Sequence, residues 1–332
     1  MSLVTEEKAA SAASDATLLR RKADVILPIL IFGCLLCVPF IARLGSESYV
    51  LSLMTRVVIL ATAAIALDLL IGQAGMISLG HAAYLGIGTY AVGILAAHGI
   101  TNIAIIVPLA LVAGVIFSFA TGIIAIRSQG AYFIMITLAF GQMLFFVVTA
   151  LAQYGGDDGM TLSARSDLFG IEIFKSDRSL YFVAFGFLLA MYLLLRRIVH
   201  SHFGRVLAGT RENEVRMQAI GFKPMQYRLC AYVIAGTVTA LAGVLLANQA
   251  NFVSPSTMTW QRSAELMFIV VLGGVGSLHG VILGAAVFLI GEEYLAQWTE
   301  HWPIVFGPLL ILTVFFARNG LIALFPGSGR RL

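Results

Sequence analysis

The stretch SHFGRVLAGTRENEVRMQAIGFKPMQYR, residues 201–228, is a polar island between two long apolar runs. Of the 332 residues in the chain, 59% are hydrophobic and only 11% are charged. Soluble domains carry about 25% charged residues, so this composition indicates a protein that crosses a lipid bilayer several times. The island therefore lies outside the hydrocarbon, and its charges require an explanation.

Apolar runs on both sides of the island predict the membrane-spanning helices. A spanning helix needs about 20 mostly apolar residues, which places spans near 25–43, 50–71, 80–98, 102–126, 131–153, 180–198, 228–250 and 303–318. The region 264–297 is too long for one span, and the sequence GGVGS at 273–277 interrupts it. We expect two helices separated by a glycine break there. The predicted fold is an all-α polytopic membrane protein with about ten transmembrane helices, including one Gly-broken helix pair.

The charges of the loops predict the orientation of these spans. Basic residues favour the cytoplasmic side, and they mark the N-terminal tail (1–23), the island and its flanks (199–227), and the C-terminal tail (324–332). Acidic residues outnumber basic ones in the loop 154–179, so we expect that loop outside. The transmembrane domain, 24–323, would then have five spans before the external loop and five after it.

Five spans on each side of the loop, starting from opposite sides, fit two inverted five-helix halves. GQAGMISLGH at 72–81 loosely matches GGVGSLHG at 273–280, but these segments do not fall at matching places in the two halves. The sequence leaves an internal repeat open.

A glycine-rich stretch with polar side chains follows the second span. Non-helical backbone inside a bilayer survives only where protein buries it or where it lines an aqueous cavity, and broken helices can guide polar solutes. Small residues also let helices pack closely, so both interpretations stay open. The residues expected to line a translocation path are Gln73, Gly75, Ser78, Gly80, His81, Gly274 and Ser277. His81 has no Cys, Asp or Glu at helical spacing, so no metal is expected.

Two charged residues fall within the second span, Arg56 and Asp68. Twelve residues of helix separate them by about 18 Å, so they cannot pair with each other. Each could extend toward the headgroups, or Asp68 could serve as a gate or proton site. Asn248, Gln249 and Asn251 close a later span and are expected at the outer face.

Residues 204–220 of the island predict one short helix. Glu212 and Arg216 form a favourable i,i+4 pair, Gly221 can end the helix, and Pro224 prevents its continuation. A short helix of mixed polarity between two spans suits the groove of a partner protein. Its basic bias also permits a helix lying flat on anionic headgroups.

Enzymatic and nucleic-acid functions lack support in the sequence. A phosphate-binding Gly-x-x-x-x-Gly-Lys-[Ser/Thr] loop is absent, as are paired histidines at metal spacing. No nucleophile motif lies near a base, and no exposed basic domain is available for nucleic acid. We expect no catalytic site and no cofactor in this chain.

Several motifs resemble one transporter family. GQAGMISLGHAAYLGIGTY at 72–90 resembles the most characteristic segment of branched-chain amino acid ABC importer permeases of the LivM type. GRVLAGTRENE at 204–214, followed by AIG at 219–221, resembles the coupling loop of that family. AGTVTALAG at 235–243 and VLGGVGS at 271–277 match its second half. The resemblance covers roughly residues 45–325.

The resemblance implies a set of partners in a bacterial inner membrane. These are a second related permease that completes a heterodimer, two cytoplasmic ABC ATPases that hydrolyse the ATP, and an extracytoplasmic substrate-binding protein. The loop would sit in a groove of one ATPase. The residues matched to this coupling role are Gly204, Arg205, Arg211, Glu212, Asn213, Glu214 and Gly221. Arg216 and Met217 depart from the family pattern, which has two alanines there.

The resemblance specifies the family more closely than the substrate. It favours Leu, Ile and Val, while related branches that carry urea or short amides share similar motifs. A secondary transporter driven by an ion gradient is the runner-up, and it would require a functional acidic residue deep in the membrane, for which Asp68 is the candidate.

Overall fold

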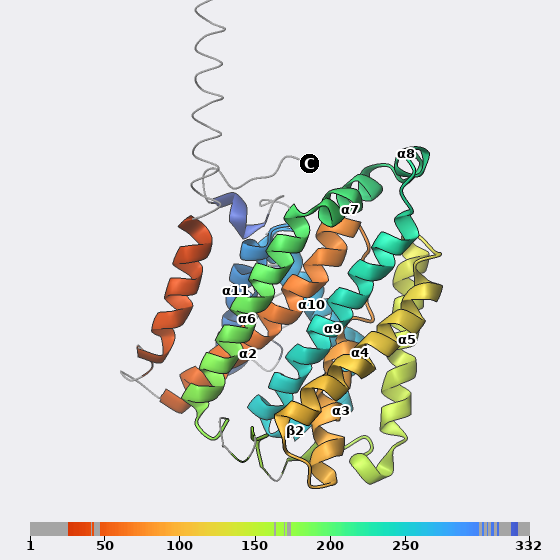
Figure 1. The fold of residues 1–332 in the computed structure, drawn as a ribbon. Coiled ribbons are helices and arrows are strands. Elements are labelled where there is room, and N and C mark those ends of the chain that lie inside the picture. The colour runs from red at the N-terminus through yellow and green to blue at the C-terminus, as the bar shows by residue number, and fades with distance from the viewer. Residues whose placement is uncertain are drawn as a thin grey trace, which may run out of the picture.

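A computed structural model of the chain shows a bundle of long helices (Figure 1). The structure describes residues 26–298 except 41, 43–46, 163, 169 and 171–173, together with 301, 304, 307, 308, 311 and 320–324. The N-terminal tail 1–23, most of the predicted span 303–318, and all but the first residue of the C-terminal tail 324–332 lie outside the described residues.

Two long helices form the centre of the bundle. Helix α2, Glu47–Asp68, continues without interruption into the π-helical turn η2, Leu69–Ala74, and α9 spans Pro224–Ala250. The second half of α2 is buried on all sides, and the middle of α9 is largely buried. A helix that is apolar all round belongs in the interior of a bundle, which explains the central position of α2.

The other helices surround this centre. They are the helix Ile26–Phe40, α3 (Ala82–Ala97), α4 (Ile103–Ala125), α5 (Ala131–Thr149), α6 (Asp177–His200), α10 (Trp260–Gly273) and α11 (Leu278–Trp298). Six helices of the described part, counting α2 with η2 as one, are long and apolar enough to cross a membrane. The outward faces of α4, α5 and α6 expose large apolar side chains. The protein is therefore an all-α polytopic membrane protein.

The predicted glycine break is confirmed. Helix α10 ends at Gly273 and α11 begins at Leu278. Between them Gly274 has φ +110° and Gly276 has φ +81°, which are backbone conformations that side chains other than glycine rarely tolerate. The region 264–297 is therefore two helices.

Helix α9 packs against α3 through glycines. A Cβ at Gly88 would overlap the carbonyl oxygen of Ala240, and one at Gly243 would overlap the carbonyl oxygen of Leu85. Backbones that approach this closely are typical of helix pairs in membranes, where small residues at the contact permit dense packing.

The island and the loop 154–179 lie at opposite ends of the bundle. Helices α7 (His202–Glu212) and α8 (Glu214–Ala219) project at one end, and strand β2 (Phe252–Val253) lies at the other (Figure 1). Strand β1 (Met160–Thr161), in the loop 154–179, pairs with β2 in antiparallel register. Short 3-10 turns occur at Ala152–Tyr154, Pro255–Met258 and Leu321–Leu324.

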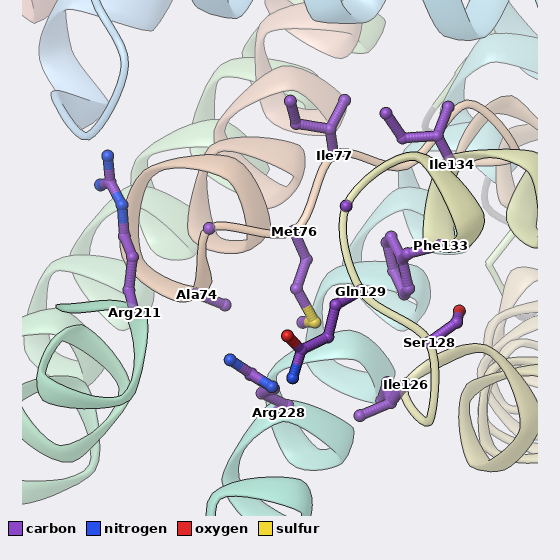
Figure 2. Close-up of a pocket in the computed structure, with 12 residues that line it drawn as sticks. Ala74, Met76, Ile77, Ile126, Ser128, Gln129, Phe133, Ile134, Arg211 and Arg228 are labelled. Carbon is purple, nitrogen blue, oxygen red and sulfur yellow. The ribbon is translucent and has the colours of Figure 1, made fainter. Parts of the chain in front are cut away.

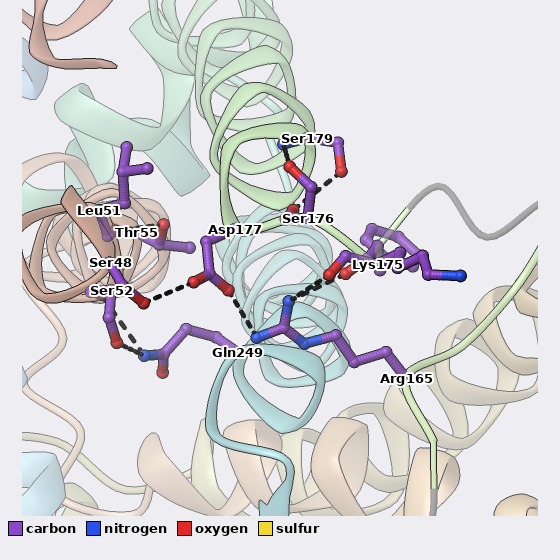
Figure 3. Close-up of polar contacts among 11 residues, drawn as sticks. Ser48, Leu51, Ser52, Thr55, Arg165, Lys175, Ser176, Asp177, Ser179 and Gln249 are labelled. Carbon is purple, nitrogen blue, oxygen red and sulfur yellow. Dashed lines mark hydrogen bonds and ion pairs between the residues drawn. The ribbon is translucent and has the colours of Figure 1, made fainter. Parts of the chain in front are cut away.

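Polar contacts fasten the loop 154–179 to three helices. Arg165 pairs with Asp177 of α6 at 2.8 Å, and Asp177 also accepts a hydrogen bond from Ser48 of α2 at 2.8 Å (Figure 3). Buried Asn248 of α9 accepts a hydrogen bond from the backbone N–H of Ser166 at 2.7 Å. The described residues of the loop are therefore held against this end of the bundle.

A carboxylate stabilises the base of this loop. Asp167 accepts hydrogen bonds from the Thr101 hydroxyl, at 2.5 Å, and from the backbone N–H of Gly170, at 2.8 Å. These two bonds, the Thr101 hydroxyl foremost, hold the pKa of the Asp167 carboxyl below its usual range because they favour the ionised form.

Candidate coupling segment and broken helices

The island folds as two helices, so the prediction of one helix over 204–220 was wrong. Helix α7 ends at Glu212 and α8 begins at Glu214. Asn213 between them is extended, and its side chain accepts the backbone N–H of Arg216 at 2.9 Å. Asn is among the residues that best cap helix N-termini, which explains the break. The expected Glu212–Arg216 pair falls across this break.

Two glycines shape the ends of the segment. Gly204 is buried against the turn that joins α6 to α7, and a Cβ there would overlap the carbonyl oxygen of Val199. Gly221 follows α8 with φ +99°, the left-handed region that commonly ends helices. Both positions therefore require glycine for backbone reasons.

Glu214 joins three elements near the start of α8. Its carboxylate pairs with Arg228 of α9 at 2.8 Å and accepts a hydrogen bond from Gln129, in the turn between α4 and α5, at 2.9 Å. Glu214 thus positions α8 against the bundle. Glu212, by contrast, is exposed at the end of α7, and Arg205 contacts the His200 carbonyl and the His202 ring of the preceding turn.

Arg211 contacts the end of the central helix. Its Nη1–H donates to the carbonyl oxygen of Gly72 at 2.5 Å, although much of the side chain stays exposed. The last carbonyls of a helix have no partner within the helix, so the guanidinium supplies one. Sequence reasoning predicted Arg211 as a docking contact and missed this one, because nothing local links positions 72 and 211.

A cavity of about 200 Å³ opens beside these residues (Figure 2). Met76 and Gln129 line it from different segments of the chain, Phe133 and Ile134 contribute apolar side chains, and Arg228 lies at its edge. The cavity lies at the α7–α8 end of the bundle, between residues 74–77, at the end of the α2–η2 helix, and the turn that joins α4 to α5.

The first break follows the π-helical turn. Gly75 has φ +69° and ends η2, and the non-helical residues 76–80 lead to α3, which begins at Ala82. This break touches the second one directly. A Cβ at Gly72 would lie 2.5 Å from the Cα of Gly276, and Asp68 Oδ1 accepts the backbone N–H of Gly276 at 2.7 Å.

The predicted path residues of the first break lie mostly inside the chain. Gln73, Ser78, Gly80 and His81 are buried, whereas Gly75 is exposed. Gly80 packs against the backbone of α5, and a ring nitrogen of His81 lies 2.8 Å from the Thr239 hydroxyl. In the second break Gly274 is buried and Ser277 is half-buried. The structure favours close packing for the buried members, and their role in a path stays a prediction.

The two charged residues of the second span differ in burial. Asp68 is 1% exposed and accepts the backbone N–H of Gly276, so the expectation that it extends toward headgroups was wrong. The Arg56 side chain is 29% exposed and pairs with Glu292 of α11 at 3.4 Å, and its extension toward headgroups stays a prediction. A buried charge in an apolar span signals that a partner exists, but not which one.

Comparison with known proteins places this architecture in a family. The family described as "Branched-chain amino acid transport system / permease component" matches residues 49–314, which include both breaks and the α7–α8 segment. The chain belongs to this family. It is 27% identical to the high-affinity branched-chain amino acid transport system permease protein LivM of Salmonella typhimurium over 307 residues, covering 86% of this chain and 71% of the relative.

Other permeases of this kind are similar over most of their length. The chain is 24% identical to BraD of Pseudomonas aeruginosa over 282 residues, covering 79% of the chain and 91% of the relative. It is 24% identical to LivH of Escherichia coli, also over 282 residues, covering 79% of the chain and 90% of the relative. No solved structure matches it. The chain is thus a permease subunit of an ABC importer, and the expected family is confirmed.

Proposed function

We propose that this permease subunit forms half of the path by which an ATP-driven importer carries branched-chain amino acids across a bacterial inner membrane. Its partners are a second related permease, two cytoplasmic ATPases that hydrolyse the ATP, and an extracytoplasmic binding protein. The observation that carries the proposal is the α7–α8 segment, which projects from the end of the bundle opposite the loop 154–179 (Figure 1). The names of the similar permeases support leucine, isoleucine and valine as substrates.

The directions of the helices support ten crossings with both termini in the cytoplasm. Helix α2 begins beside α6, where Glu47 pairs with Arg178, and its η2 extension ends beside α7, where Arg211 meets Gly72. With the helix Ile26–Phe40, α3, α4 and α5, it supplies five passes before the loop 154–179. Helices α6, α9, α10 and α11 supply four after it, and 303–318 would supply the tenth. The α7–α8 end then faces the cytoplasm.

An inverted repeat is supported by the two central helices. The α2–η2 helix has 28 residues, ends before Gly75 with φ +69°, and leads through a non-helical segment into the 16-residue α3. Helix α9 has 27 residues, ends before Asn251 with φ +51°, and leads through 252–259 into the 14-residue α10. The two helices end at opposite faces. The segment equivalent to 75–81 is therefore 251–259, rather than the glycine break at 273–277.

The coupling residues divide into two groups. Glu212 is exposed on α7 and is available to a groove of the ATPase, together with the exposed outer face of α8. Gly204, Asn213, Glu214 and Gly221 set the shape and position of the segment, and Arg205 fixes its first turn. We assign the path to the surface around Gly75 and Ser277, which are accessible in the single chain.

The first test is uptake of radiolabelled leucine by cells that express this chain with the other subunits of its transporter. The control carries a substitution of the phosphate-binding lysine in the ATPases. Uptake that this substitution abolishes, and that isoleucine and valine compete, is the expected result. Uptake that survives it and collapses with a protonophore would contradict the proposal, whereas ATP-dependent uptake of urea or amides alone would change the substrate.

The docking surface has its own test. Glu212→Lys should weaken association with the ATPase because it reverses an exposed charge that makes no hydrogen bond or ion pair with the described residues. Copurification of the ATPase with the permease measures this, and unchanged copurification and uptake would contradict the assignment.

A further inference from the structure

One side chain of the coupling segment bonds the end of the central helix α2–η2. Arg211 belongs to α7 and bonds the carbonyl oxygen of Gly72, 139 residues earlier in the chain. Gly72 lies within η2, where the helix dipole leaves partial negative charge on the terminal carbonyls. The cationic guanidinium therefore occupies a position that the helix end favours.

The aliphatic part of the Arg211 side chain also packs closely against this helix end. A Cβ on Gly75 would lie 2.9 Å from Cγ of Arg211, closer than ordinary packing allows. Gly75 also has the φ of +69° with which η2 ends. Glycine at this position therefore permits both the left-handed turn and the close approach of the Arg211 side chain. We expect movement of α7 to displace this helix end, because the guanidinium and the aliphatic part of Arg211 both contact it.

The residue that Arg211 holds also touches the second break. The backbone of Gly72 packs against that of Gly276, and Asp68, one turn earlier, accepts the Gly276 N–H at 2.7 Å. Arg211, Gly72 and Gly276 thus form a continuous contact from α7 through the end of the central helix to the turn between α10 and α11. Helix ends of this kind absorb the backbone changes of hinge motions.

We infer that Arg211 is the positioning residue that transmits movement of the coupling segment to both helix breaks. This inference rests on the proposed function and specifies how ATPase closure reaches the path. Two other arginines near the segment are engaged elsewhere: Arg205 contacts its own turn, and Arg228 pairs with Glu214. Coupling between two binding sites typically amounts to about 5- to 150-fold in affinity, and we expect loss of this link to lower transport rather than binding of the ATPase.

The test is Arg211→Met in the complete transporter reconstituted into liposomes. Methionine keeps a flexible stem against Gly75 and removes the donor. We expect the ATPases to copurify as with the unchanged permease and basal ATP hydrolysis to persist, while uptake per ATP hydrolysed falls at least tenfold. Arg211→Lys, which keeps a cationic donor, should recover part of the uptake. The matched control is Arg197→Met, which removes an exposed arginine from the last turn of α6, just before α7.

Three results would overturn the inference. Loss of ATPase copurification in Arg211→Met would make Arg211 a docking contact, and uptake per ATP equal to that of Arg197→Met would make the Gly72 bond incidental. A purely structural role would lower the yield of folded complex without changing uptake per ATP, which also counts against transmission. Failure of the proposed function is distinct, because the unchanged complex itself would then show no ATP-driven uptake.

Discussion

Replacing Asp68 by Asn separates an ATP-driven permease from a transporter that moves protons or ions. Asp68 is an acidic residue buried in a membrane span, the kind of group that an ion-coupled mechanism would use. In the structure its Oδ1 accepts the Gly276 N–H at 2.7 Å. The amide oxygen of Asn can accept the same bond, so the second break should keep its position while the ionisable group is lost.

The expected cost follows from the strength of that bond. A hydrogen bond to a charged group contributes about 1.5–3 kcal/mol and a neutral one about 0.5–1.5 kcal/mol, so Asp68→Asn should cost about 1 kcal/mol. In Asp68→Leu the leucine side chain has a similar shape but cannot accept the hydrogen bond from Gly276. A buried N–H that is left without an acceptor costs about 1–3 kcal/mol. We therefore expect Leu to be the more damaging of the two.

The assay is thermal unfolding of the purified complex in detergent, combined with uptake into liposomes at two pH values. Asp68→Asn should transport at near-normal rates with unchanged dependence on ATP and pH, and Asp68→Leu should unfold at lower temperature. A folded Asp68→Asn protein without uptake, or one whose pH dependence is lost, would refute a structural role and favour ion coupling.

Three further predictions concern the loop 154–179 and the helix packing. Because the pKa of the Asp167 carboxyl is lower in the folded protein, Asp167 stabilises the loop fully at pH values above the ordinary pKa of an aspartate. This stabilisation is lost as the pH falls through the folded-state pKa. Thr101→Val should shift the loss to higher pH, which can be measured as protease cleavage of the loop at a series of pH values. Asn248→Leu removes the buried acceptor of the loop and should raise cleavage at neutral pH, at a cost of about 1–3 kcal/mol. Gly88→Ala overpacks the α3–α9 contact and should cost about 1–3 kcal/mol in thermal unfolding, whereas Gly186→Ala, with open space around it, should be neutral or stabilising.

The helices were predictable because hydrophobic length is a property of consecutive residues. The apolar runs at 50–71, 102–126 and 228–250 correspond to α2, α4 and α9, with ends that differ by a few residues. The break at 273–277 was equally readable, since glycines at adjacent positions interrupt an apolar run that is too long for one span. The family followed from motifs whose order along the chain is itself informative.

The contacts of the candidate site were not predictable in the same way. Arg211 and Glu214 read as exposed docking residues, yet one bonds Gly72 and the other pairs with Arg228. These partners are far away in sequence or belong to another helix, and only the packed bundle brings them together. Asn213 illustrates a local signal that was missed: an Asn ahead of Glu-Val-Arg is a helix cap, and reading it so would have divided the island correctly.

The course of α9 has a mechanical consequence. One end of this helix lies beside α8, where Arg228 holds Glu214, and the other carries Asn248, which grips the loop 154–179. At 1.5 Å per residue its 27 residues make a rod about 40 Å long, so a tilt of about 5° displaces one end by about 3 Å relative to the other. Under the proposed function, movement of the ATPase at one end of α9 and docking of a loaded binding protein at the other end would therefore act on the same rigid helix.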